Sequence, residues 1–190
     1  CTIQDERGMM PITDHQNELR KKHVGASESA AILGLSPWTT AYDVWLEKTG
    51  KVELPESLNE AADIGNMIED GLLDYAASKL AVKILKNQFR VHEGGVLSAT
   101  HDVLVVDKPE GLEAKTSGIM SFYGREDWGE DGTDAVPDHV LIQCQQQALV
   151  SKLDVIHVPA LIGGRGRLMF SVERSETICA VILERVTAFW

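Results

Sequence analysis

Apolar residues recur at helical spacing through the first half of the chain. Residues 13–16 resemble a capping box and predict a short helix that runs toward Lys22. Ser27 is a candidate N-cap for a second helix that ends at Gly34, and a third helix is predicted over residues 40–50. The N-terminal half is therefore expected to be mainly helical.

A longer helix is predicted over about residues 58–80, because its apolar side chains fall on one stripe. The stripe consists of Ile64, Ile68, Leu72 and Tyr75 or Ala76. Glu69 lies beside this stripe, one turn after Gly65. Two interpretations of Glu69 stay open: a charge at the boundary of the apolar face, or a carboxylate that contributes to a metal site.

After residue 82 the helical period gives way to short alternating or β-branched segments, which predict strands. They cover residues 83–86, 88–91, 96–100, 102–106 and 112–116. Pro137 suits the first turn of a helix that runs to about Leu153. Strands are then expected over residues 154–162 and 167–172, around a glycine-rich turn, and a final helix from Ser175.

Length and composition fit one globular domain. The 190 residues are 44% hydrophobic and 25% charged, and the order of elements predicts an α+β or α/β core. We expect a single domain over residues 1–190 with a flexible segment at residues 1–12. The net charge of −11 argues against a protein that coats nucleic acid through indiscriminate attraction to phosphates.

The cysteines favour a reducing compartment. Cys1, Cys144 and Cys179 are odd in number and widely spaced, so they provide neither a disulfide framework nor a CxxC site. The sequence lacks an apolar run of the ~20 residues that a membrane span needs. We therefore expect a cytoplasmic protein that does not associate with a membrane.

The segment from Asp102 to Lys115 carries the most informative chemistry. If Asp107–Glu110 form a four-residue hairpin loop, Leu104 pairs with Glu113 and Asp102 pairs with Lys115. Side chains alternate along strands, so Asp102, Glu113 and Lys115 would share one face. Two carboxylates in this arrangement suit Mg²⁺. Two roles stay open for a lysine beside them: to orient or deprotonate a metal-bound water, or to stabilise charge in a phosphoryl transition state. The alternative is a solvated hairpin with an ordinary polar face.

Three further residues are candidates for the same site. Gln145 has apolar neighbours one turn away in both directions, so its amide is interpreted as turned inward, either as a satisfied core group or as a site residue. Gln143, Gln146 and Gln147 are expected at the surface. Arg20 and Ser27 flank a predicted helix start, where backbone N–H groups and an arginine suit a phosphate; a simple capping role is the alternative for Ser27.

Several ordered segments resemble the family of YqaJ-type viral recombinases and lambda exonuclease. They are the run GASESAAILGLSPW at residues 25–38, WLEKTG at 45–50, GNMIE at 65–69, ATHD at 99–102, EAKT at 113–116 and IQCQ at 142–145. The resemblance extends over about residues 20–190 in the family's order. It implies a PD-(D/E)xK restriction-endonuclease-like core, in which helices flank a central mixed sheet.

The resemblance also implies an activity and its residues. Family members digest linear double-stranded DNA from the 5′ end with two Mg²⁺ or Mn²⁺ ions and leave a 3′ single strand for an annealing protein. The implied metal ligands are Asp102, Glu113 and the Ala114 carbonyl, with Glu69 near them, and Lys115 is the implied catalytic lysine. Gln145 would contact a metal-bound water, and Arg20 and Ser27 would hold the 5′-phosphate. A phage or prophage origin and a homotrimeric ring are implied as well.

Two departures from the family's pattern flank the predicted metal ligand. His101 stands where a proline is usual and Val103 where a glycine is usual, so the geometry of this strand needs inspection. The aromatic residues Trp38, Tyr42 and Trp45 are expected in the core, and a wedge near the point of strand separation is the alternative for Trp38. Two other functions stay open from the residues: an endonuclease with the same core, and a non-catalytic module that binds DNA ends.

Overall fold

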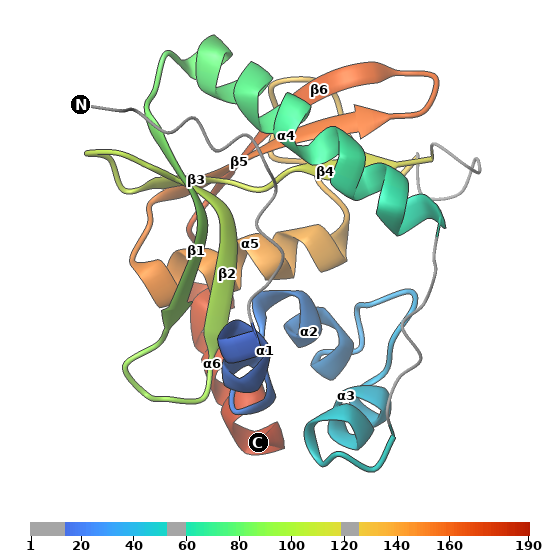
Figure 1. Ribbon diagram of the computed structural model, residues 1–190, viewed down its shortest axis with the longest axis vertical. Coiled ribbons are helices and arrows are strands. Elements are labelled where there is room, and N and C mark those ends of the chain that lie inside the picture. Colours follow the sequence, from blue (N-terminus) through green and yellow to red (C-terminus); the bar gives the residue numbers. More distant parts are fainter. Residues whose placement is uncertain (1–13, 53–59, 119–125) are drawn as a thin grey trace.

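A six-stranded mixed sheet forms the centre of the computed structural model, which describes residues 14–52, 60–118 and 126–190 (Figure 1). Four helices precede the sheet in sequence: α1 (Asp14–Lys21), α2 (Ala26–Ile32), α3 (Ala41–Lys48) and α4 (Glu60–Leu80). The helices predicted in this half of the chain are therefore confirmed. Residues 1–12, Thr13 and the predicted start of the long helix at residue 58 lie outside the described residues.

The start of α2 differs from the prediction. Its N-cap is Gly25, and Ser27 lies inside the first turn as an exposed residue. The carboxylate of Glu28 accepts a hydrogen bond from the Gly25 backbone N–H at 2.7 Å. A glutamate at the third helical position thus stabilises the helix start in the way that a capping box does, so no serine is needed as the cap.

Helix α3 begins as predicted, but its aromatic residues do not lie in the core. Thr40 caps the helix: its Oγ1 accepts from the Asp43 N–H, and Asp43 Oδ2 accepts from the Thr40 N–H. Tyr42 and Trp45 of α3 are 64% and 37% exposed, and Trp38, which precedes the helix, is 77% exposed, whereas Val44 is buried. The short helix turns Val44 rather than its larger neighbours inward, so the core prediction for these aromatic residues is wrong.

The first strands are longer than the sequence pattern suggests. β1 (Ile84–Val91) continues through Asn87, which adopts a positive φ of 54°, and β2 (Ser98–Val105) continues through His101. The two strands pair antiparallel along their length, with Ile84 opposite Val105 and Val91 opposite Ser98. The four segments predicted here are therefore two strands. Neither Asn87 in β1 nor His101 in β2 interrupts the pairing between them.

The segment predicted as one strand at residues 112–116 is instead divided. β3 (Glu110–Leu112) pairs antiparallel with β2 and parallel with β5 (Val155–Ile162), and β4 (Lys115–Ser117) pairs with β5 alone. Glu110 lies opposite Val155 and Lys115 opposite Ala160, so both short strands keep one register along β5. They form one path along β5 that is interrupted at Glu113 and Ala114.

The hairpin register also differs from the prediction. Leu104 pairs with Gly111, not with Glu113, and Val103 pairs with Leu112. The shift is two residues along one strand, which preserves the alternation of faces. Asp102 therefore comes to the level of Glu113 rather than of Lys115, on the predicted face.

Helices cover both faces of the sheet around β5 and β6 (Gly166–Glu173). On one face, Leu73 and Ala76 of α4 pack with Val103, Leu112 and Met169. On the other face, α5 (Asp138–Ser151) packs through Val140, Cys144 and Ala148 against Ile156, Val158, Ala160 and Phe170. Met169 and Phe170 are neighbours in β6 and serve opposite faces, as strand alternation requires.

A third apolar cluster joins the N-terminal helices to the end of the chain. Ala26 and Ala30 of α2 pack with Ile142 of α5 and with Cys179 and Ile182 of α6 (Glu176–Phe189). Ser175 caps α6 as predicted. Cys144 and Cys179 are buried free thiols. No helix in the described parts of the chain is long and apolar enough to cross a membrane.

Candidate active site

One face of β2 contributes three polar side chains to an open cavity. Ser98, Thr100 and Asp102 are two residues apart, so alternation directs them to the same side of the strand. Together with α2 and α5 they line a cavity of about 160 Å³, several times the ~30 Å³ that one water molecule occupies in the liquid. The cavity is therefore large enough for a hydrated ion or a phosphate group.

Asp102 lies where the ladder between β2 and β3 ends. The Glu113 N–H still donates to the His157 carbonyl of β5, at 3.0 Å. The next N–H, of Ala114, donates to Asp102 Oδ2 at 2.9 Å instead of to the backbone of β2. The strand interruption therefore opens a space between β2 and β4, and the Asp102 carboxylate lies in it.

Glu113 is the most constrained carboxylate of the site. It is 3% exposed, and its Oε1 accepts hydrogen bonds from Lys115 Nζ and from Gln143 Nε2, each at 2.5 Å. Its Oε2 accepts from Gln147 Nε2 at 2.6 Å. A buried carboxylate is stable only when it is paired and hydrogen-bonded, and these three donors supply both conditions. The predicted group of Asp102, Glu113 and Lys115 is brought together by the fold.

The glutamines of α5 are distributed differently from the prediction. Gln143 and Gln147 are one helical turn apart and both reach Glu113. Gln146, predicted at the surface, is fully buried and donates to the carbonyls of Val24 and Ser98. Gln147 is 1% exposed, so it too is not at the surface.

The structure does not bring Gln145 to the carboxylates. Its Nε2 donates to the Glu173 carbonyl, and its Oε1 accepts from the Ser175 N–H, both at 2.8 Å. The amide therefore joins α5 to the turn before α6. The inward orientation predicted for Gln145 is confirmed. Of its two interpretations, the structure matches the satisfied core amide and not the site residue.

Sequence reasoning missed Gln143 and Gln147 because it treated α5 as half exposed. The helix is enclosed by the sheet, α2 and α6, so a polar side chain on almost any face is buried. A signal was present in the sequence: two glutamines at i and i+4 on a helix that follows a D…ExK segment.

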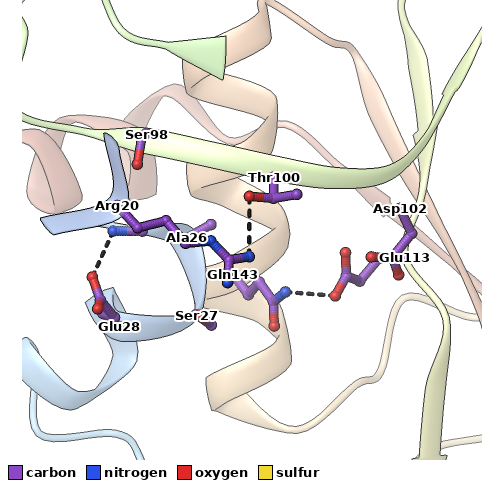
Figure 2. Close-up of a pocket in the computed structure, with 10 residues that line it drawn as sticks. Arg20, Ala26, Ser27, Glu28, Ser98, Thr100, Asp102, Glu113 and Gln143 are labelled. Carbon is purple, nitrogen blue, oxygen red and sulfur yellow. Dashed lines mark hydrogen bonds between the residues drawn. The ribbon is translucent and has the colours of Figure 1, made fainter. Parts of the chain in front are cut away.

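Arg20 and Ser27 lie on the wall of the same cavity, opposite the carboxylates. Figure 2 shows the Arg20 side chain extending from the end of α1 toward β2, where its Nη2 donates to Thr100 Oγ1 at 3.2 Å. Ser27, in the first turn of α2, also lines the cavity, as does Gln143. A cation and a hydroxyl thus flank a space that Asp102 and Glu113 close on the other side.

Glu69 lies on α4, on the side of the carboxylates away from Arg20. With Asn66 and Leu72 of α4 it lines a second cavity, of about 240 Å³, that Asp102, Glu113 and Lys115 also line. Glu69 is half-buried. The pair Asp102 and Glu113 therefore forms the partition between a cavity beside Arg20 and a cavity beside Glu69.

The charges of the site perturb one another strongly. Burial raises the pKa of Asp102 well above its usual range, and the negative charges of Glu113 and Glu69 raise it further. Burial also raises the pKa of Glu69, with the same effect from Glu113. Burial lowers the pKa of Lys115, but Glu113 and Asp102 outweigh that effect and raise it overall, so the amine is charged at neutral pH.

This donor set fits a hard divalent cation in its chemistry. The negative charge of Glu113 raises the pKa of Asp102, both carboxylates line two open cavities, and a cation would relieve the repulsion. Within the described ranges, no three His, Cys, Asp or Glu side chains converge closely enough to hold a metal ion. Glu69 is therefore a wall residue in this arrangement, and its role as a metal ligand stays a prediction.

The two departures from the family's pattern leave the strand intact. His101 is 1% exposed and pairs in register with Gln88 of β1. Its Nε2 forms a hydrogen bond of 2.6 Å with Ser151 Oγ. Burial lowers the pKa of His101 to about 4, so the ring is neutral. Val103 is fully buried and pairs with Leu112. Asp102 is held in a regular strand between them.

Comparison with known proteins identifies the family of the chain. Residues 16–154 match the YqaJ-like viral recombinase domain. The chain belongs to this family. It is 29% identical over 175 residues to the uncharacterized protein YqaJ of Bacillus subtilis (strain 168), a match that includes 90% of this chain and 53% of YqaJ. The chain thus spans about half the length of this curated relative.

Solved structures of two exonucleases share the fold. The alkaline exonuclease LHK-Exo of Laribacter hongkongensis, in its complex with dAMP, superposes with a TM-score of 0.73 at 17% identity, over 93% of this chain and 90% of that one. A phage-related exonuclease of Haemophilus somnus 129PT gives a TM-score of 0.61 at 14% identity, over 88% and 91%. At these identities the likeness establishes the fold alone, a central mixed sheet flanked by helices.

Proposed function

We propose that this YqaJ-like domain is a metal-dependent 5′→3′ exonuclease that digests linear double-stranded DNA. The observation that carries the proposal is the convergence of Asp102, Glu113 and Lys115 at an interrupted strand, between two open cavities. The exonuclease names of structures with the same fold support it.

Asp102, Glu113 and the Ala114 carbonyl would hold Mg²⁺, or Mn²⁺ in its place, with Glu69 beside them. When bound, such ions activate water and neutralise charge on a phosphate. Two ions are part of the proposal, because Asp102 and Glu113 border a cavity on each side.

Lys115 acts as a fixed positive charge. Its amine is protonated at neutral pH and is held against Glu113, so it is suited to stabilise negative charge that develops on a scissile phosphate. Gln143 and Gln147 hold the Glu113 carboxylate in a single orientation.

Arg20 and Ser27 would bind the terminal 5′-phosphate of the strand that is cleaved. A guanidinium can clamp a phosphate, and a hydroxyl on the first turn of a helix lies near free backbone N–H groups. Both residues line the cavity that contains the carboxylates, which supports recognition of a strand end next to the bond to be cut. The remaining 3′ strand would pass to an annealing protein, and a homotrimeric ring around DNA belongs to the same proposal.

The test compares 5′-phosphorylated linear duplex with covalently closed circular duplex, each with and without Mg²⁺. We expect degradation of the linear duplex only, and only with the metal. Rapid cleavage of the closed circle would favour an endonuclease instead. Binding of an unchanged linear duplex, with Mg²⁺ or Mn²⁺ present, would favour a non-catalytic end-binding module.

A further inference from the structure

A buried ion pair joins the three N-terminal helices behind the cavity. Lys48, in the last turn of α3, places its Nζ 2.8 Å from Glu28 Oε1. The Lys48 side chain is 7% exposed and the Glu28 side chain is 20% exposed. Lys48 belongs to the WLEKTG segment, to which the proposed catalytic chemistry assigns no role.

The same ammonium also contacts the end of α1. Lys48 Nζ donates to the backbone carbonyl of Arg20 at 2.7 Å, which satisfies an acceptor in the last turn of that helix. Arg20 is thus held at two points: its carbonyl by Lys48 and its guanidinium by Thr100.

Glu28 connects this lysine to the start of α2. While Oε1 pairs with Lys48, Oε2 accepts the Gly25 N–H at 2.7 Å. Ser27 is the residue immediately before Glu28. Arg20 and Ser27 therefore come from two helices that are fixed to each other through one lysine on a third helix.

We propose that Lys48 is a positioning residue for recognition of a terminal phosphate monoester: it acts through the Arg20 carbonyl and Glu28 to keep the Arg20 guanidinium and the Ser27 hydroxyl at one spacing. This inference rests on the proposed role of Arg20 and Ser27 in binding a 5′-phosphate. Lys48 is mostly buried behind these residues and does not line the cavity, so it acts without contacting DNA.

The test measures binding in the absence of divalent metal, so that it does not depend on cleavage. Dissociation constants are measured for a linear duplex with 5′-phosphate ends and for the same duplex with 5′-hydroxyl ends. The readout is the ratio of the two constants. A general loss of structure weakens both complexes equally and leaves this ratio unchanged.

Three variants isolate the contribution of Lys48. Removal of Lys48 alone leaves a buried carboxylate unpaired and threatens folding, so the main variant is the double substitution K48M/E28Q, in which the amide can still accept the Gly25 N–H. E28Q alone keeps the contact between Lys48 and Arg20. K51M is the matched control, because Lys51 is exposed and lies 3.9 Å from the Trp45 ring centroid.

We expect the preference for 5′-phosphate to fall about tenfold in K48M/E28Q, to fall by less in E28Q, which keeps the contact between Lys48 and Arg20, and to persist in K51M and in the conservative variant K48R. In a background that already carries Arg20→Ala, K48M/E28Q should cause no further loss. An unchanged preference in a folded K48M/E28Q protein would overturn the inference, as would a wild-type protein that does not distinguish the two ends. A wild-type protein that prefers 5′-phosphate ends but does not degrade DNA in Mg²⁺ would contradict only the proposed exonuclease activity.

Discussion

Glu113 shows how a single buried charge organises the site. It is almost fully removed from solvent, and a lysine and two glutamine amides supply its hydrogen bonds. An unpaired carboxylate at this depth would cost several kcal/mol. The residues around Glu113 therefore serve both stability and the orientation of one carboxylate.

Two glutamines of α5 should respond differently to the same substitution. Gln143→Leu removes a donor to Glu113 in the cavity, so we expect kcat/KM on linear duplex to fall by about tenfold or more, with a small change in stability. Gln145→Leu leaves the Ser175 N–H and the Glu173 carbonyl without their partner, so we expect a loss of about 1–3 kcal/mol in the free energy of unfolding.

Kinetics of the folded fraction and urea unfolding check both expectations. The rate of folded Gln145→Leu protein should match that of the wild type. If Gln145→Leu abolished catalysis while Gln143→Leu did not, the assignment of the two amides would be wrong.

Individual site residues were predictable where strand alternation decided them. Asp102, Glu113 and Lys115 follow from a period of two, which survives a register shift of two residues. The glutamines were not predictable in the same way, because their environment depends on three separate elements that pack around α5. The prediction for Trp38 and Tyr42 fails in the opposite sense, because both were predicted in the core and both are exposed, Tyr42 on α3 and Trp38 before that helix.

The interruption between β3 and β4 is the element that creates the site. Both halves keep their register on β5, while β2 pairs with β3 only at Val103 and Leu104 and does not pair with β4. The sequence pattern indicated a strand here but not its division, because the break depends on an Asp102 carboxylate that takes the place of a backbone partner. Helix bounds were predicted more closely, because caps and periods are local.

Gly111 tests how tightly β3 is packed. A Cβ at this position would lie 2.9 Å from Ile156 Cδ1, 3.2 Å from Leu153 Cδ1 and 3.3 Å from the Val103 carbonyl oxygen. We expect Gly111→Ala to lower the free energy of unfolding by about 1–3 kcal/mol, as overpacked core substitutions do.

The matched control is Gly71→Ala in α4. A Cβ there meets no atom within 4 Å, and alanine favours a helix interior by up to about 1 kcal/mol over glycine. Urea unfolding of both variants should therefore give changes of opposite sign. If Gly111→Ala left the free energy of unfolding unchanged or raised it, the space around Gly111 would be larger than these distances indicate.

At the scale of the whole molecule, the fold brings distant segments to one acidic centre. The end of α1, the start of α2, β2, the β3–β4 junction and the middle of α5 all border the first cavity. The net charge of −11 includes Glu69, Asp102 and Glu113, whose repulsion a divalent cation would relieve. An acidic chain is thus compatible with a DNA substrate that is engaged locally at Arg20 and Lys115.

The most direct measurement is the initial rate of nucleotide release from 5′-phosphorylated linear duplex in Mg²⁺, for the wild type and for Lys115→Ala. Removal of the amine that pairs with Glu113 should lower the rate of the folded protein by about a hundredfold or more. Because it also leaves a buried carboxylate without its cation, circular dichroism measures the folded fraction to which the rate is normalised. The proposed chemistry predicts metal-dependent release by the wild type alone. Comparable release by folded Lys115→Ala, or none by the wild type in Mg²⁺ or Mn²⁺, would contradict it.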